Sequence, residues 1–216
     1  MPTLRLTAST LAILVALVVA ALGHPGTAPA QTPPKTAPKP AAKPAAPAPT
    51  AAVQPTPGAG PILVVETVKG TFEFETYPDD APKTVEHVLT LTRKGFYNGQ
   101  RFHRVVPGFV VQVGDPQSRD VSKRDSWGRG LFAGSGKPVG LAEFSKKHLH
   151  VKGAVGMAHA GNAAQADAQF YVTLAALPRL NGKYAVFGRL ISGLDVPARI
   201  QVGDILKRMY VKPPAK

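Results

Sequence analysis

The sequence contains no cysteine among its 216 residues. This absence excludes disulfide bonds, a thiolate nucleophile and a cysteine-based zinc site, and it also excludes a lipid anchor on an N-terminal cysteine. A chain without thiols can fold in either an oxidising or a reducing compartment. Its chemistry must therefore rest on the remaining polar side chains and on the backbone.

Acidic residues are missing from the first 60 positions, whose only charged side chains are Arg5, Lys35, Lys39 and Lys43. The rest of the chain then holds 22 of the 26 basic residues and all 13 acidic ones, a net charge of +9. A basic domain can attract nucleic acid or anionic membranes. Because no nucleic-acid motif or basic stripe with interleaved aromatics accompanies the charge, we interpret it as a solvated surface and expect no nucleic-acid partner.

Long apolar runs are also scarce. The run LAILVALVVAALG at residues 11–23 is shorter than the roughly 20 residues that a membrane-spanning helix needs. It follows a lone charge at Arg5 and precedes small residues at 28–30, which is typical of a secretory signal peptide. We predict a signal peptide over 1–30, a periplasmic or secreted location, and no stable membrane insertion once it is cleaved. An uncleaved membrane anchor is the alternative.

Residues 31–60 consist mainly of proline, alanine and lysine. A segment of this composition cannot bury a core, and its prolines favour an extended, solvated polyproline II conformation. We predict a Pro/Ala/Lys-rich disordered linker over 31–60. It is either a semi-rigid spacer that holds the domain away from a membrane or partner, or a passive tail.

The globular part is predicted at residues 61–216. It shows about eight short strand patterns and two helical ones within roughly 155 residues. So many strands with so few helices argue against a covered parallel sheet. We predict a mainly β fold, a closed eight-stranded antiparallel β-barrel capped by two α-helices.

The first helix is expected within the segment YPDDAPKTVEHVLTLTRKG. Asp79 or Asp80 is a suitable cap, and Pro82 suits the first turn. Gly95 suits the position just beyond the last turn, where a left-handed backbone is common. A shorter second helix is expected within GLDVPARIQVG.

The stretch QRFHRVVPGFVVQVGDP, residues 100–116, places Arg104 and Gln112 inside an apolar run. A turn at Pro107-Gly108 puts Arg104 opposite Val111, and a one-residue bulge brings it level with Gln112. Side chains alternate across a strand, so one face of this hairpin is apolar and the other carries a guanidinium and an amide. Such a mixed face suits a ligand that is partly apolar and partly polar. Alternatively, Arg104 pairs with a surface carboxylate.

These motifs resemble the cyclophilin-type peptidyl-prolyl cis–trans isomerases. The segment GFYNGQRFHRVVPGFVVQVGDP is similar to their signature, and YPDDAPKTVEHV, AQFYVTL, LNGKYAVFGRL and GLDVPARIQVGD match in the same order. The resemblance covers about residues 61–212 and points to a bacterial secreted member. It implies a cyclophilin-like fold and a reaction that needs neither cofactor nor metal.

The resemblance places the catalytic arginine on Arg104 and the glutamine that holds a substrate carbonyl on Gln112. It implies that the substrate-binding residues are Phe109, Val110, Ala158, His159, Ala160, Gln169, Tyr171, Leu180 and Tyr184. Among these, Phe109, Val110, Tyr171 and Leu180 form the apolar proline pocket. The chain departs from the usual pattern in having His159 for asparagine, Arg179 for a tryptophan common in eukaryotic members, and Asp167-Ala168 where Gly-Ser is common.

Rotation about an X–Pro bond breaks no covalent bond, so it requires no nucleophile or redox group. We predict an isomerase, and a monomer, that acts on unfolded or newly exported proline-containing polypeptides. The alternative is a chaperone or adaptor of the same fold that binds proline segments with little turnover. The other histidines are interpreted as structural: His103 as a packing residue, and His148 and His150 as side chains that lack the partners for a metal site.

Overall fold

The computed structural model describes residue 56 and residues 59–129 and 134–214. The predicted signal peptide and most of the predicted linker lie outside the described residues. The strands are β1 (Ile62–Thr67), β2 (Gly70–Thr76), β3 (Arg104–Val106), β4 (Val110–Val113), β5 (Ala154–Met157), β6 (Phe170–Thr173), β7 (Val186–Ser192) and β8 (Leu206–Val211). The helices are α1 (Pro82–Arg93) and α2 (Val196–Arg199), with short 3-10 turns η1 (Pro116–Arg119), η2 (Val121–Ser126), η3 (Ala163–Gln165) and η4 (Pro178–Leu180).

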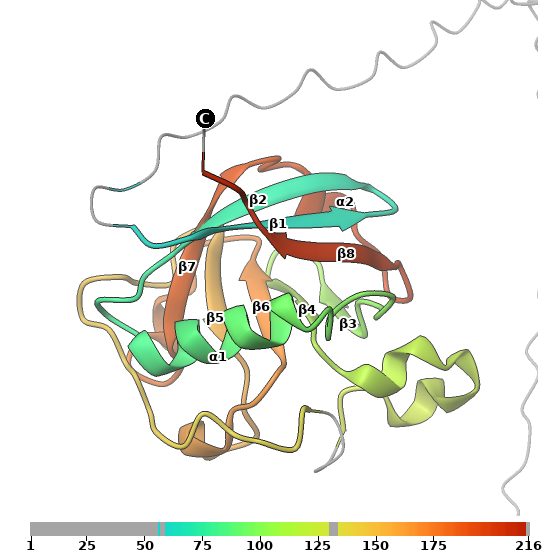
Figure 1. Cartoon of the computed structure of the whole chain (residues 1–216), viewed down its shortest axis with the longest axis horizontal. Coiled ribbons are helices and arrows are strands. Elements are labelled where there is room, and N and C mark those ends of the chain that lie inside the picture. Colours follow the sequence, from blue (N-terminus) through green and yellow to red (C-terminus); the bar gives the residue numbers. More distant parts are fainter. Residues whose placement is uncertain (1–55, 57–58, 130–133, 215–216) are drawn as a thin grey trace, which may run out of the picture. The chain divides into compact units, whose positions relative to one another are not determined.

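The eight strands form one antiparallel sheet in the order β3-β4-β6-β5-β7-β2-β1-β8. The mainly β class and the strand number were correctly predicted, but the closed barrel was wrong, because the edge strands β3 and β8 do not pair with each other. The sheet is curled and open (Figure 1). Its edges are linked by an isolated bridge between Arg101 and Ile205, in the segments that precede β3 and β8. Backbone hydrogen bonds flank this bridge, among them Leu206 N to Gln100 O (2.8 Å) and Phe102 N to Asp204 O (3.0 Å).

Helix α1 begins at Pro82, as predicted, and Gly95 follows its end with a φ of 67°. The predicted cap at Asp79 or Asp80 was wrong, since the N-cap position is Ala81 and no side chain caps the helix from there. The carboxylate of Glu143 instead accepts hydrogen bonds from the backbone N–H groups of Lys83 (2.9 Å) and Thr84 (2.8 Å). A distant loop therefore satisfies the free N–H groups of the first turn.

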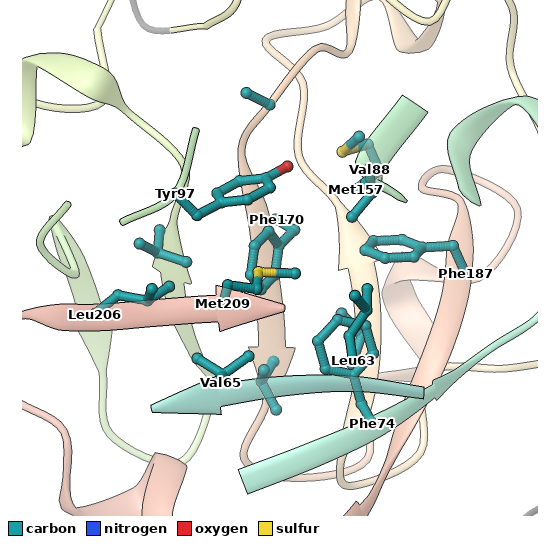
Figure 2. Packing of buried hydrophobic residues seen from close by; sticks show 14 of the residues in the cluster. Leu63, Val65, Phe74, Val88, Tyr97, Met157, Phe170, Phe187, Leu206 and Met209 are labelled. Atoms are coloured by element: carbon teal, nitrogen blue, oxygen red, sulfur yellow. The ribbon is translucent and has the colours of Figure 1, made fainter. Parts of the chain in front are cut away.

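The core of the domain is built mainly from one face of the sheet and the inner face of α1. Figure 2 shows Val88 of α1 beside Met157 of β5. The rings of Phe74, Phe170 and Phe187 lie 6.1–6.3 Å apart, two of the three pairs edge to face, a favourable aromatic arrangement. All of these side chains are almost fully buried. The opposite face of β4 and β6 does not take part in this core.

The N-terminal boundary of the domain involves the buried carboxylate of Glu75. It accepts hydrogen bonds of 2.5 Å from both the backbone N–H and the hydroxyl of Thr56, and one of 3.0 Å from the hydroxyl of Tyr77. The backbone N–H of Gly60 donates to the carbonyl of Thr76 at 2.8 Å. The last residues of the predicted linker thus contact β2.

Helix α2 is a single turn of four residues, so the second predicted helix is present but minimal. Within the described residues, no helix is both long enough and apolar enough to cross a bilayer.

Candidate active site

The hairpin of β3 and β4 carries Arg104 and Gln112 as direct partners across the two strands. The expected register opposite Val111 does not occur, because three residues, Pro107 to Phe109, separate the strands. The longer turn shifts the pairing by one residue without a bulge. Val111 enters the core as predicted, so Arg104 and Gln112 are left on the outer face.

A line of polar side chains crosses this outer face. The guanidinium of Arg104 donates a hydrogen bond of 3.3 Å from Nη1 to Oε1 of Gln112. The Nε2 group of Gln112 donates in turn to Oε1 of Gln169, at 2.9 Å. Arg104 is exposed, whereas the two glutamines are half-buried. These hydrogen bonds orient the guanidinium of Arg104. The alternative prediction, that Arg104 pairs with a surface carboxylate, was wrong within the described residues.

An apolar cluster lies on the same face of the sheet. Its buried members are Val110, Tyr171 and Leu177, and its partly buried members are Phe109, Ala158, Leu180 and Tyr184. We call these seven residues the outer cluster. Every residue assigned to the proline pocket from the sequence belongs to it. Leu177 was not predicted, because its position in a loop before η4 gives no periodic signal.

The predicted substrate-binding histidine, His159, turns its ring toward the domain. Its Nε2–H donates to the carbonyl of Lys183 at 2.8 Å, and its ring stacks on Tyr184 with 4.4 Å between centroids. Tyr184 in turn meets Tyr171 edge to face at 6.0 Å. His159 therefore supports the wall of the outer cluster through Tyr184.

A hollow of about 650 Å³ adjoins the hydrogen-bonded side chains of Arg104, Gln112 and Gln169. Predicted site residues that line it are Gln112, Ala158, His159, Ala160 and Gln169. Asp167, which also lines it, accepts hydrogen bonds from Ser135 Oγ (2.6 Å) and Gly136 N (2.9 Å) and pairs with His87 of α1 (3.1 Å). Burial alone would raise the pKa of Asp167, but the hydrogen bonds from His87 and Ser135 outweigh it and lower that pKa. This carboxylate ties the loop beside the hollow to the helix.

Tyr171 has a buried polar partner that sequence reasoning missed. Its hydroxyl lies 2.8 Å from Nε2 of His150, whose Nδ1 lies 3.0 Å from Oδ1 of Asn181. Burial lowers the pKa of His150 and raises that of Tyr171, so both remain neutral at pH 7. His148 instead pairs with Asp80, and within the described residues no three His, Asp or Glu side chains are arranged to hold a metal.

A family model described as cyclophilin type peptidyl-prolyl cis-trans isomerase/CLD matches residues 62–214. The chain belongs to the cyclophilin family. This cyclophilin is 39% identical over 167 residues to a probable peptidyl-prolyl cis-trans isomerase of Brucella abortus, covering 76% of this chain and 85% of that one.

Two further comparisons agree. The cyclophilin is 39% identical over 140 residues to peptidyl-prolyl cis-trans isomerase B of Bacillus subtilis, covering 65% of this chain and 90% of the relative. A crystal structure of a Cryptosporidium parvum cyclophilin-type isomerase superimposes with a TM-score of 0.59 at 26% identity, over 72% of this chain and 99% of the other. That parasite protein has also been solved in the presence of the dipeptide Ala-Pro, with a TM-score of 0.56 over 71% of this chain and 99% of that chain. The activity of the present cyclophilin is peptidyl-prolyl cis–trans isomerisation.

Proposed function

We propose that the proline ring of a substrate sits on the outer cluster while Arg104 donates a hydrogen bond to the prolyl nitrogen. The observation that supports this most directly is the position of the guanidinium. Its Cζ lies 5.4 Å from the ring centroid of Phe109, its Nη1 is held by Gln112, and it is exposed. A cation beside an apolar surface is thus ready to meet a substrate that is apolar at proline and polar at its amide.

The reaction requires a donor of this kind. Amide resonance sets a barrier of about 18–20 kcal/mol to rotation, and the resonance is lost as the bond twists. The lone pair on the prolyl nitrogen then becomes localised, so a donor aimed at it stabilises only the twisted state and lowers the barrier. A hydrogen bond from a charged donor contributes about 1.5–3 kcal/mol, or roughly 10- to 100-fold in rate. The outer cluster would supply the rest by fixing the ring.

We propose that Gln112 and Gln169, with the backbone of residues 158–160, bind the peptide on either side of the rotating bond. Their polar groups line the hollow next to the outer cluster. Proline-containing polypeptides are the substrate class, in keeping with the Ala-Pro dipeptide used with the parasite relative.

The test is an isomerisation assay on an X–Pro peptide with Arg104→Ala and Arg104→Lys. We expect at least a tenfold loss of kcat/KM for Arg104→Ala, with an unchanged circular dichroism spectrum. Arg104→Lys keeps the charge but not the planar fork of donors, so its activity should also fall well below wild type. Full activity in Arg104→Ala would contradict the proposal.

We also propose that the protein is an exported monomer that acts on newly exported or unfolded chains in the periplasm or outside the cell. The support is the apolar run at 11–23 with its single preceding charge at Arg5 and the small residues at 28–30. The membrane-anchored form is the alternative. Determining the N-terminus of the exported protein distinguishes them, because a start near Gln31 shows cleavage and a start at Met1 shows an anchor. Light scattering, which gives the molar mass in solution, tests whether the protein is a monomer.

A further inference from the structure

A second guanidinium stands beside the outer cluster. The Cζ atom of Arg179, in η4, lies 4.7 Å from the ring centroid of Phe109, closer than the Cζ of Arg104 at 5.4 Å. Both arginines are exposed, and Phe109 is half-buried between the sheet and solvent. Two positive charges therefore share one aromatic ring at the mouth of the proline site.

Neither arginine has a negative partner among the described residues. All 13 acidic residues of the chain lie in the part that the structure describes, and none forms an ion pair with Arg104 or Arg179. Other arginines do find carboxylates: Arg199 lies 3.0 Å from Asp195, and Arg189 lies 3.7 Å from the buried Glu75. The charge at the mouth of the site is left uncompensated.

The two arginines differ in what they are free to do. Arg104 donates to Gln112 and, in the function proposed above, to the prolyl nitrogen. Arg179 contacts the ring of Phe109, and a guanidinium near an aromatic ring retains N–H donors for other partners. Those donors match the geometry of a carboxylate, which a guanidinium can bind through two parallel hydrogen bonds.

We propose that Arg179 is a specificity-determining residue that selects proline segments carrying an acidic residue next to the proline. The inference rests on the proposed function, because the proline must occupy the outer cluster for its neighbour to reach Arg179. The substrate carboxylate replaces the counter-ion that the protein lacks. A basic neighbour is repelled by Arg179 and Arg104 together. The charge of Arg179 thus selects among peptides, while the hydrogen bond from Arg104 to the prolyl nitrogen is unchanged.

The test measures kcat/KM for peptides that differ only in the residue before or after proline, which is Glu, Gln or Lys. In the wild-type protein, we expect a preference at one of these two positions. There, kcat/KM for the Glu peptide should exceed kcat/KM for the Gln peptide by about two- to fivefold, the range of an exposed ion pair. The Lys peptide should fall below Gln. These differences should shrink when NaCl is raised from about 20 mM to about 1 M, because salt screens exposed charges.

Two variants locate the effect. Arg179→Gln should bring the Glu to Gln ratio close to one, and Arg179→Glu should reverse the order so that Lys is favoured. Arg208→Gln is the matched control, since Arg208 is also exposed and lies over a ring, 4.5 Å from the centroid of Tyr210 on β8. It removes the same charge from the domain and should keep the wild-type ratio.

Failure of the proposed role of Arg179 can be distinguished from failure of the proposed isomerase site. Wild-type protein that turns over all the peptides equally at both positions overturns the role of Arg179 alone. So does a Glu preference that survives in Arg179→Gln, or one that is lost equally in Arg208→Gln. No turnover of the Gln peptide by the wild type would overturn both the selection and the proposed isomerase site.

Discussion

The hydroxyl of Tyr171 and the Nε2 atom of His150 lie 2.8 Å apart, with both side chains almost fully buried. The Oδ1 atom of Asn181 can only accept, so Nδ1 of His150 carries the imidazole proton and Tyr171 donates its own to Nε2. The backbone N–H of His150 donates to the same Oδ1 at 2.9 Å. This network holds in place the largest buried ring of the outer cluster, on which we propose that the substrate proline rests.

Removing the hydroxyl should therefore destabilise the protein. In Tyr171→Phe, the buried Nε2 atom of His150 loses its donor, at a cost of about 1–3 kcal/mol in the free energy of unfolding. Urea unfolding measures this change. Tyr184→Phe is the matched control, because the hydroxyl of Tyr184 forms no hydrogen bond within the described residues, and a small change is expected there. Equal effects of the two substitutions would show that the bond to His150 contributes nothing.

The stability of the protein should fall as the pH drops below about 6.5, the usual pKa of histidine. Burial lowers the pKa of both His150 and His103 in the folded state. Below about pH 6.5 the unfolded chain then binds more protons than the folded one, which favours unfolding as the pH falls toward the folded-state values. The pKa of Asp167 is also lowered in the folded state, but this carboxylate affects stability at lower pH. The stability that it contributes is lost only as the pH falls below about 3.9, the usual pKa of aspartate.

Thermal unfolding between pH 7.5 and 5 measures this dependence. We expect Tm to decrease across the range, and to decrease less steeply in His150→Gln, which removes one of the two histidines whose pKa is lowered by burial. A Tm that rises as the pH falls through this range would contradict the assignment of neutral, buried histidines.

The isomerase rate, by contrast, should change little between pH 6.5 and 8. The proposed donor, Arg104, is a guanidinium, and guanidinium groups stay charged throughout this range. His150 stays neutral there because burial lowers its pKa. A profile of kcat/KM against pH on a neutral peptide is the measurement. A clear bell shape would instead assign proton transfer to a histidine such as His159 or His103.

The start of α1 should depend on Glu143. This carboxylate, 8% exposed, accepts from the N–H groups of Lys83 and Thr84. Glu143→Ala leaves both donors unsatisfied and should lower the free energy of unfolding by about 1–3 kcal/mol. Glu86→Ala is the control on the same helix, since Glu86 pairs with Lys83 at 3.2 Å on the exposed surface and should cost under about 1 kcal/mol. Similar losses in urea unfolding for both variants would rule out the cap.

Local sequence patterns predicted several parts of this protein. The alternation along residues 100–116 correctly placed Val111 in the core and Arg104 and Gln112 on the outer face, because alternation is a property of the strand itself. Pro82 and Gly95 marked the ends of α1 for a similar reason, as each residue restricts or permits backbone angles at its own position. The motifs around them also sufficed to indicate the family.

Tertiary structure decided what depends on residues distant in the chain. The cap of α1 is Glu143 and not the adjacent Asp79 or Asp80, because the path of a loop brings that carboxylate to the helix. The sheet remains open because β3 and β8 do not pair with each other, although the segment before β3 is hydrogen-bonded to residues 203–206. Likewise, His150 reaches Tyr171 from a loop, and Arg179 reaches Phe109 from η4. Backbone geometry and side-chain alternation are local and can be read along the chain, whereas the partner of a polar group is set by packing, which places distant segments within hydrogen-bond reach.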